Sequence, residues 1–212
     1  MKLHAAIKLA ERVKRELQPL CDHIEIAGSI RRGRELVNDI DLVILPKASV
    51  DCIKARCKDR CRVITDGRQN FICAMQLPTP AGGVEEFQID IFFAHAGVAD
   101  LIAPDPSNFG SLLLCRTGSK GHNIKLAQRA KDLDMHWNPY RGLFAGGIWE
   151  LEGQESVYKG GKIIASETEE QIFQALGLNW LSPALRETTF STGPSIEEIC
   201  KPEANAVHGA TS

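Results

Sequence analysis

Two aspartates placed two positions apart are the first residues in this sequence that could do chemistry. Asp39 and Asp41 lie in the run Asp39-Ile40-Asp41-Leu42-Val43. In a strand, such residues point to the same face about 7 Å apart, while the apolar residues beside them enter the core. Paired carboxylates of this kind can hold a divalent cation such as Mg²⁺ or Mn²⁺. The spacing alone favours a solvated surface strand, so the case for a cation site depends on the neighbouring residues.

The turn before these acids has the composition of a phosphate-binding loop. It reads Ala27-Gly28-Ser29-Ile30-Arg31-Arg32-Gly33. Gly28 permits close approach of the backbone, Ser29 offers a hydroxyl and an N–H, and Arg32 can supply a guanidinium group. We expect this turn to hold phosphate beside the two carboxylates.

A third acid lies in an otherwise apolar strand, Gln88-Ile89-Asp90-Ile91-Phe92. A buried, unpaired carboxylate would cost several kcal/mol, so Asp90 must be exposed, paired or bound to metal. Three carboxylates around two hard cations match the two-metal arrangement for phosphoryl transfer. Asp90 is the candidate for accepting or relaying the proton of an attacking hydroxyl.

The elements that would position these residues are those of an α+β protein. An amphipathic helix is predicted to begin at Leu3 and to end near Pro19. The other expected elements are strands over 24–27, 40–45 and 84–94, a helix over 50–59, and a hairpin turning at Asp66-Gly67. The first half therefore predicts a mixed sheet with a few helices over residues 1–105.

The second half predicts a smaller α+β unit over residues 106–190. A helix over 107–115 is broken at Thr117-Gly118 and followed by a helix over about 122–133. Both Ser166-x-x-Glu169 and Thr168-x-x-Gln171 have the pattern of a capping box before a helix that stops at Gly177. The segment 191–212 has almost no apolar periodicity and predicts a disordered tail.

Composition and charge describe an ordinary folded chain. It has 212 residues with a net charge of -2 and seven cysteines, none in a C-x-x-C pattern. These cysteines are interpreted as reduced and structural. The sequence lacks a signal-peptide or membrane-spanning pattern, which predicts a soluble, intracellular protein without membrane contact.

A local basic patch stands out against this balanced charge. Residues 106–141 contain six Lys and Arg residues but only two acidic residues. Lys120, Lys125 and Arg129 begin near a helix N-terminus, where backbone donors favour phosphate, and are predicted to contact a nucleic-acid backbone.

Taken together, GSIRRG, DIDLVI, QIDIFF and TGSKGHNIKLAQRA resemble the family X DNA polymerases, in the same order and spacing. The likeness extends to about Glu187. It implies a nucleotidyltransferase palm that holds metal through Asp39, Asp41 and Asp90, followed by a C-terminal nucleotide-binding subdomain. It also implies two Mg²⁺ or Mn²⁺ ions.

The resemblance also assigns the nucleotide-binding residues. It places Gly28, Ser29 and Arg32 on the incoming triphosphate, and it places Gly118 and Ser119 near its sugar and base. Asn123 is assigned to the minor-groove edge of the incoming nucleotide.

The sequence departs from the family at positions that bear on substrate choice. Family members often have an aromatic pair before T-G-S that helps to exclude ribose, whereas this chain has Cys115-Arg116. A frequent template-contacting arginine is replaced by Ala127. Looser discrimination against ribonucleotides and lower fidelity are therefore expected. We also expect no lyase activity, because the palm-like pattern begins within the first thirty residues, and no exonuclease activity, because the six histidines never form an H-x-H motif.

The resulting hypothesis is a minimal, monomeric DNA polymerase. It would add deoxynucleoside triphosphates to the 3′-hydroxyl of a primer-template or gapped duplex, filling short gaps in DNA repair, with weak and salt-dependent binding. One alternative keeps the chemistry and changes the substrate to an RNA end, a small molecule or a protein. A second alternative is a non-catalytic DNA-binding module.

Overall fold

The computed structural model divides into two compact units, residues 1–96 and residues 97–212. It describes residues 1–47, 49–78, 82–97, 106–153, 155–187 and 195–201. The predicted boundary between residues 105 and 106 falls at the edge of a segment outside these described residues. Each unit is described by itself.

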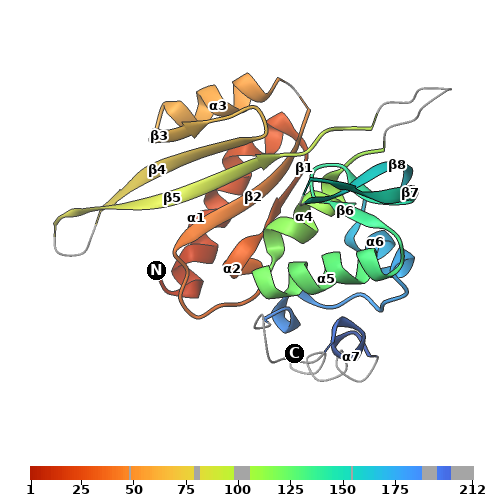
Figure 1. Cartoon of the computed structure of the whole chain (residues 1–212). Helices are drawn as coiled ribbons and strands as arrows, with labels where there is room; N and C mark the ends of the chain where they lie inside the picture. The colour runs from red at the N-terminus through yellow and green to blue at the C-terminus, as the bar shows by residue number, and fades with distance from the viewer. Residues whose placement is uncertain (48, 79–81, 98–105, 154, 188–194, 202–212) are drawn as a thin grey trace. The chain divides into compact units, whose positions relative to one another are not determined.

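The first unit is a mixed sheet with helices (Figure 1). Its elements in chain order are α1 (Leu3–Leu17), the 3-10 helix η1 (Gln18–Leu20), β1 (Cys21–Ile26), α2 (Gly28–Arg31), β2 (Asp39–Pro46), α3 (Val50–Lys58), β3 (Cys61–Asp66), β4 (Asn70–Pro78) and β5 (Val84–Phe93). The strand order is β1-β2-β5-β4-β3. Strands β2 and β5 run parallel, and the other neighbours are antiparallel. The predicted mixed sheet and the hairpin at Asp66-Gly67 are confirmed.

The core of this unit follows from two periodicities. Every third or fourth residue of α1 is buried, including Ala6, Leu9 and Val13. Alternate residues of β2, Ile40 and Leu42, join the same apolar cluster. Because successive side chains of a strand alternate between faces, the residues between them point to the opposite face of the sheet.

The second unit combines helices with a three-stranded antiparallel sheet of order β6-β7-β8. Its elements are α4 (Phe109–Thr117), α5 (Lys120–Asp132), β6 (His136–Asn138), β7 (Gly142–Glu152), β8 (Glu155–Ala165), α6 (Glu169–Ala175), the 3-10 helix η2 (Pro183–Leu185) and α7 (Ile196–Ile199). Its core joins α4, α5 and α6 to the first residues of β7 and the last of β8. In the part of the chain that the structure describes, no helix is both long and apolar enough to cross a bilayer.

The end of the chain differs from the predicted disordered tail. Residues 191–194 and 202–212 lie outside the described residues, but residues 195–201 contain helix α7. Ser195 and Glu198 form a capping box at its start, and Ile196 and Cys200 are 4% and 2% exposed within the second core. The prediction missed this helix because one turn with two apolar contacts is too short to show a periodicity.

Candidate functional site

The parallel pairing of β2 with β5 brings the three predicted carboxylates to one face of the first sheet. Asp41 lies directly opposite Asp90 in the register, and Asp39 lies opposite Gln88. Partners in register point to the same side of a sheet, and Asp39 is two residues from Asp41. All three acids therefore share the face opposite to the apolar residues Ile40 and Ile89, as the alternation in sequence predicted for β2.

All three carboxylates are half-buried. The Gln88 amide donates to Asp90 Oδ1 through Nε2 at 2.8 Å. Gln88 thus orients one oxygen of Asp90 from the same strand. Sequence reasoning passed over Gln88, although its position two residues before Asp90 was a signal that the two side chains would meet.

The turn that carries Gly28 and Ser29 presses against Asp41. The Ala27 N–H donates to the Asp41 carbonyl at 2.8 Å, which fastens the end of β1 to β2. Gly28 has φ of +59°, and a Cβ built there would lie 1.8 Å from Asp41 Oδ2. Only glycine fits this position, because any side chain would occupy the space of the carboxylate and would strain the backbone.

Beside this contact, Ser29 carries a buried hydroxyl oxygen without a hydrogen-bond partner among the described atoms. An orphaned buried hydroxyl costs free energy and is a reason to look for a ligand. Arg32 ends the short helix α2, where its N–H donates to the Gly28 carbonyl at 3.2 Å, and its side chain is half-buried. The predicted residues Gly28, Ser29 and Arg32 therefore come from one turn next to Asp41.

The chemistry of this face suits hard cations and phosphate. Carboxylate and hydroxyl oxygens are ligands that Mg²⁺ and Mn²⁺ accept. Because Gly28 has no side chain, its backbone lies directly beside the Asp41 carboxylate. Among the described residues, however, no three His, Cys, Asp or Glu side chains are gathered closely enough to form a ready metal site. The donor types fit the implied ions, and the ion site itself remains a proposal.

In the second unit, the predicted residues Gly118 and Ser119 form the turn between α4 and α5. Gly118 has φ of +69°, and Ser119 is the N-cap of α5, its hydroxyl accepting from the His122 N–H at 3.4 Å. The Ser119 hydroxyl and N–H both donate to the Arg186 carbonyl, at 2.6 and 3.3 Å. The turn is therefore tied to a residue 67 positions later in the chain.

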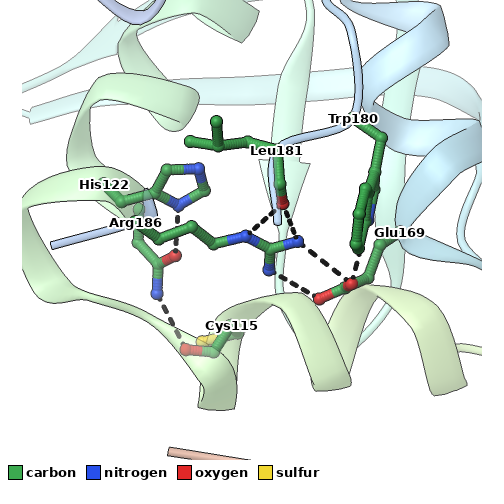
Figure 2. Close-up of polar contacts among 7 residues, drawn as sticks. Cys115, His122, Glu169, Trp180, Leu181 and Arg186 are labelled. Carbon is green, nitrogen blue, oxygen red and sulfur yellow. Dashed lines mark hydrogen bonds and ion pairs between the residues drawn. The ribbon is translucent and has the colours of Figure 1, made fainter. Parts of the chain in front are cut away.

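The predicted residue Asn123 is held by α4. Its Nδ2 donates to the Cys115 carbonyl at 2.8 Å, and its Oδ1 lies 3.4 Å from His122 Nδ1 (Figure 2). His122 is completely buried, and its Nε2 has no partner among the described atoms. Burial, with the nearby positive charge of Arg186, lowers the pKa of His122 to about 4, so the imidazole is neutral.

Figure 2 shows the buried ion pair that organises this region. Arg186 is 0% exposed and Glu169 is 3% exposed. The guanidinium donates to both carboxylate oxygens of Glu169, at 2.7 and 3.1 Å, and to the Leu181 carbonyl. Trp180 Nε1 also donates to Glu169, at 3.2 Å. This bidentate pairing fixes α6 against the segment that holds Ser119.

The sequence did not reveal this ion pair. Glu169 was interpreted as part of a capping box with Ser166, but the box that forms joins Thr168 to Gln171. The Ser166 hydroxyl instead donates to the Ser107 carbonyl at 2.8 Å. Glu169 is thereby free of a capping role and turns into the core toward Arg186.

The three predicted DNA contacts on α5 differ in their surroundings. Lys120 is exposed and Lys125 is half-buried. Arg129 makes contacts inside the second unit, donating from Nε to the Leu176 carbonyl at 3.1 Å and pairing with Glu197 at 3.1 Å. These contacts give Arg129 a structural role that joins α5 to α6 and α7.

The residues before the T-G-S turn make an aromatic contact of their own. The Arg116 guanidinium lies 5.5 Å from the centre of the Tyr140 ring and also donates to the Tyr140 hydroxyl. An aromatic side chain is therefore adjacent to Arg116, although it comes from the loop before β7 rather than from α4.

Comparisons with known proteins agree with this architecture. Residues 112–187 match the DNA polymerase beta thumb family. The chain is 24% identical over 186 residues to the DNA polymerase/3′-5′ exonuclease PolX of Bacillus subtilis (strain 168), a match that covers 86% of this chain and 28% of that protein. The chain thus spans little more than a quarter of that relative.

Two solved structures share the fold. The ternary gap complex of Leishmania infantum polymerase beta superimposes with a TM-score of 0.69 at 17% identity, over 89% of this chain and 71% of the other. The ternary P/T complex of the same polymerase gives a TM-score of 0.68 at 17% identity, over 89% and 77%. The predicted α+β fold is confirmed by these matches.

Proposed function

We propose that the chain is a family X DNA polymerase-like protein, and that it acts as a DNA-directed DNA polymerase that fills short gaps. It would add deoxynucleotides to a primer 3′-hydroxyl, using a gapped or primed duplex as template. The observation that carries the proposal is the register of β2 with β5, which sets Asp41 opposite Asp90 with Asp39 on the same face.

Each residue of this face has a role in the proposed reaction. Asp39, Asp41 and Asp90 would bind two Mg²⁺ or Mn²⁺ ions, which when bound lower the pKa of the primer hydroxyl and neutralise phosphate charge. Asp90 would accept or relay the hydroxyl proton, and its Gln88 hydrogen bond would orient the carboxylate for this task. Ser29 and Arg32 would bind the triphosphate beside Asp41.

The second unit would supply the nucleotide contacts. Gly118, Ser119 and Asn123 would face the sugar and base, with Ser119 held by the Arg186 carbonyl. Lys120 and Lys125 would contact the DNA backbone, which makes binding dependent on salt.

Primer extension on a gapped duplex tests the proposal. Asp39→Asn, Asp41→Asn and Asp90→Asn keep the shape of each side chain and remove its charge, so each should reduce incorporation by at least about a hundredfold, judged by the size of electrostatic effects in catalysis. Asp22→Asn, on an exposed acid of β1, is the matched control and should leave incorporation unchanged. Full incorporation by any of the three folded site variants would refute the assignment.

The same assay separates the proposal from its rivals. Incorporation that requires a template and follows its sequence supports a polymerase. Transfer of nucleotides to an RNA end, a small molecule or a protein, with no extension of primed DNA, would indicate another nucleotidyltransferase. Binding of duplex DNA without any transfer would indicate a non-catalytic module.

A further inference from the structure

A group of sulfur-bearing side chains lies on the opposite face of the first sheet from the three carboxylates. Cys61 is paired with Met75 across the β3–β4 ladder, and Cys73 is paired with Ile89 across the β4–β5 ladder. Ile89 is 1% exposed and belongs to the apolar core, and Asp90 follows it on β5 and points the other way. The sulfur group is therefore distinct from the proposed polymerase face.

Within this group, Cys61 and Cys73 are neighbours. Cys73 is paired with Val63, two residues after Cys61, so the two cysteines are diagonal partners on one face of an antiparallel ladder. Their side chains interact by a thiol hydrogen bond. Cys73 is 1% exposed, whereas Cys61, at the first position of the edge strand β3, is half-buried.

Both thiols line one small cavity. Its other lining residues include Cys57, at the end of α3, and the arginines Arg56 and Arg60. The cavity measures about 20 Å³, which is the space that a single water molecule needs. A reagent that reaches the thiols through it must therefore be small.

The surroundings distinguish Cys61 from the other cysteines. The hydrogen bond from Cys73 lowers the pKa of Cys61, assisted by the charge of Arg60 and opposed by burial and Glu16. In Cys57, by contrast, burial is the largest influence and raises the pKa to about 12. A partly exposed thiol with a lowered pKa beside a second, buried thiol is the arrangement found in peroxide-sensitive cysteine pairs.

We propose that Cys61 and Cys73 are a redox-sensitive pair that hydrogen peroxide converts to a disulfide. In the first step, the Cys61 sulfur attacks one peroxide oxygen, the O–O bond breaks, and the product is Cys61 sulfenic acid with hydroxide, which takes up a proton as water. In the second step, the Cys73 sulfur attacks the Cys61 sulfur, and the hydroxyl leaves with the Cys73 proton as water. Two thiols lose two electrons, and one peroxide becomes two waters.

The disulfide would cross-link the edge strand β3 to β4. Strand β4 is paired in turn with β5, and Ile72 of β4 lies opposite Asp90 of β5. The modification therefore acts on the strand next to the one that carries Asp90, without involving any residue of the carboxylate face. Its chemistry does not depend on the proposed polymerase activity.

Peptide mass spectrometry on the full chain tests this proposal. The reduced protein is treated with hydrogen peroxide, remaining thiols are blocked with N-ethylmaleimide, and the cross-linked peptides are identified. We expect a Cys61–Cys73 disulfide in the folded protein, with Cys61 oxidised about tenfold faster than the exposed Cys52. Cys61→Ser should abolish the disulfide, and the matched control Cys52→Ser should leave it unchanged.

Removal of the second thiol gives an independent measurement. In Cys73→Ala the sulfenic acid on Cys61 has no partner, so dimedone should label Cys61 in that variant at least about tenfold more than in the unmodified chain. Cys73→Val fills the buried site more closely and serves if the alanine variant does not fold. A disulfide between other cysteines, oxidation of Cys52 before Cys61, or a Cys61–Cys73 bond that forms only in urea would overturn the proposal.

Discussion

Replacement of Arg186 should destabilise the second unit severely. In Arg186→Met the side chain keeps much of its volume but loses its charge. Glu169, 3% exposed, then loses both hydrogen bonds from the guanidinium while its own charge stays in the core. Removing one partner of a buried ion pair costs about 3–5 kcal/mol. With a urea slope of about 2 kcal/mol per molar, the unfolding midpoint should fall by about 1.5–2.5 M.

Tryptophan fluorescence is the appropriate assay, because Trp137, Trp149 and Trp180 are the three tryptophans of the chain and all belong to the second unit. Urea unfolding followed by fluorescence thus reports on that unit. Circular dichroism, to which the helices of both units contribute, provides the comparison. The fluorescence midpoint should move, while the part of the transition that belongs to the first unit should stay in place.

A double substitution separates the ion pair from simple packing. Glu169→Met alone leaves a buried guanidinium and should cost a similar amount, but Arg186→Met combined with Glu169→Met removes both charges and should recover most of the loss. If Arg186→Met costs less than about 1 kcal/mol, or if the double variant is as unstable as the sum of the single ones, the buried pair does not organise this unit as we argue.

Three other outcomes follow from the described contacts. His122 has its pKa lowered to about 4 when folded, against 6.5 when unfolded. The unfolded chain therefore binds the extra proton first, so the unfolding free energy should be full above pH 6.5 and should fall by about 3 kcal/mol as the pH drops to 4. His122→Phe should remove this loss in urea titrations. Gly28→Ala places a Cβ 1.8 Å from Asp41 Oδ2 at φ of +59°, so primer extension should fall at least about tenfold while the unfolding free energy falls by only about 1–2 kcal/mol; unchanged extension would contradict the close fit. Lys125→Ala should lower the slope of log DNA affinity against log salt concentration by about 1. Arg129→Ala should leave that slope unchanged and should lower the urea midpoint of unfolding, because Arg129 pairs with Glu197.

The carboxylate face could be predicted because it depends on local patterns. Alternation along β2 determines that Asp39 and Asp41 share a face, whatever the rest of the chain does. The parallel partnership of β2 with β5, which brings Asp90 opposite Asp41, has no local signal. Asp90 was grouped with the other two acids on the chemistry of three carboxylates and on the resemblance to a known family, and the strand pairing was then supplied by the structure.

The buried network of the second unit could not be predicted, because it depends on contacts that leave no local pattern in the sequence. Arg186 and Glu169 are 17 residues apart, and each has an acceptable local interpretation, one as a solvated charge and the other as a helix cap. Two capping-box patterns overlapped by two residues, and sequence alone could not decide between them. Tertiary packing selected Thr168 with Gln171, because that choice lets Glu169 turn inward to meet the guanidinium.

The two faces of the first sheet show how one alternation can serve two chemistries. On β5, Ile89 and Asp90 are adjacent in sequence, yet one belongs to the apolar core and the other to the carboxylate face. Neighbouring β4 repeats this division, with Cys73 opposite Ile89 and Ile72 opposite Asp90. A shift of the β4–β5 register by one residue would exchange these faces and would bury the carboxylate among the thiols, at a cost of several kcal/mol. The separation of the acids from the reactive thiols is therefore enforced by the same burial that holds the sheet together.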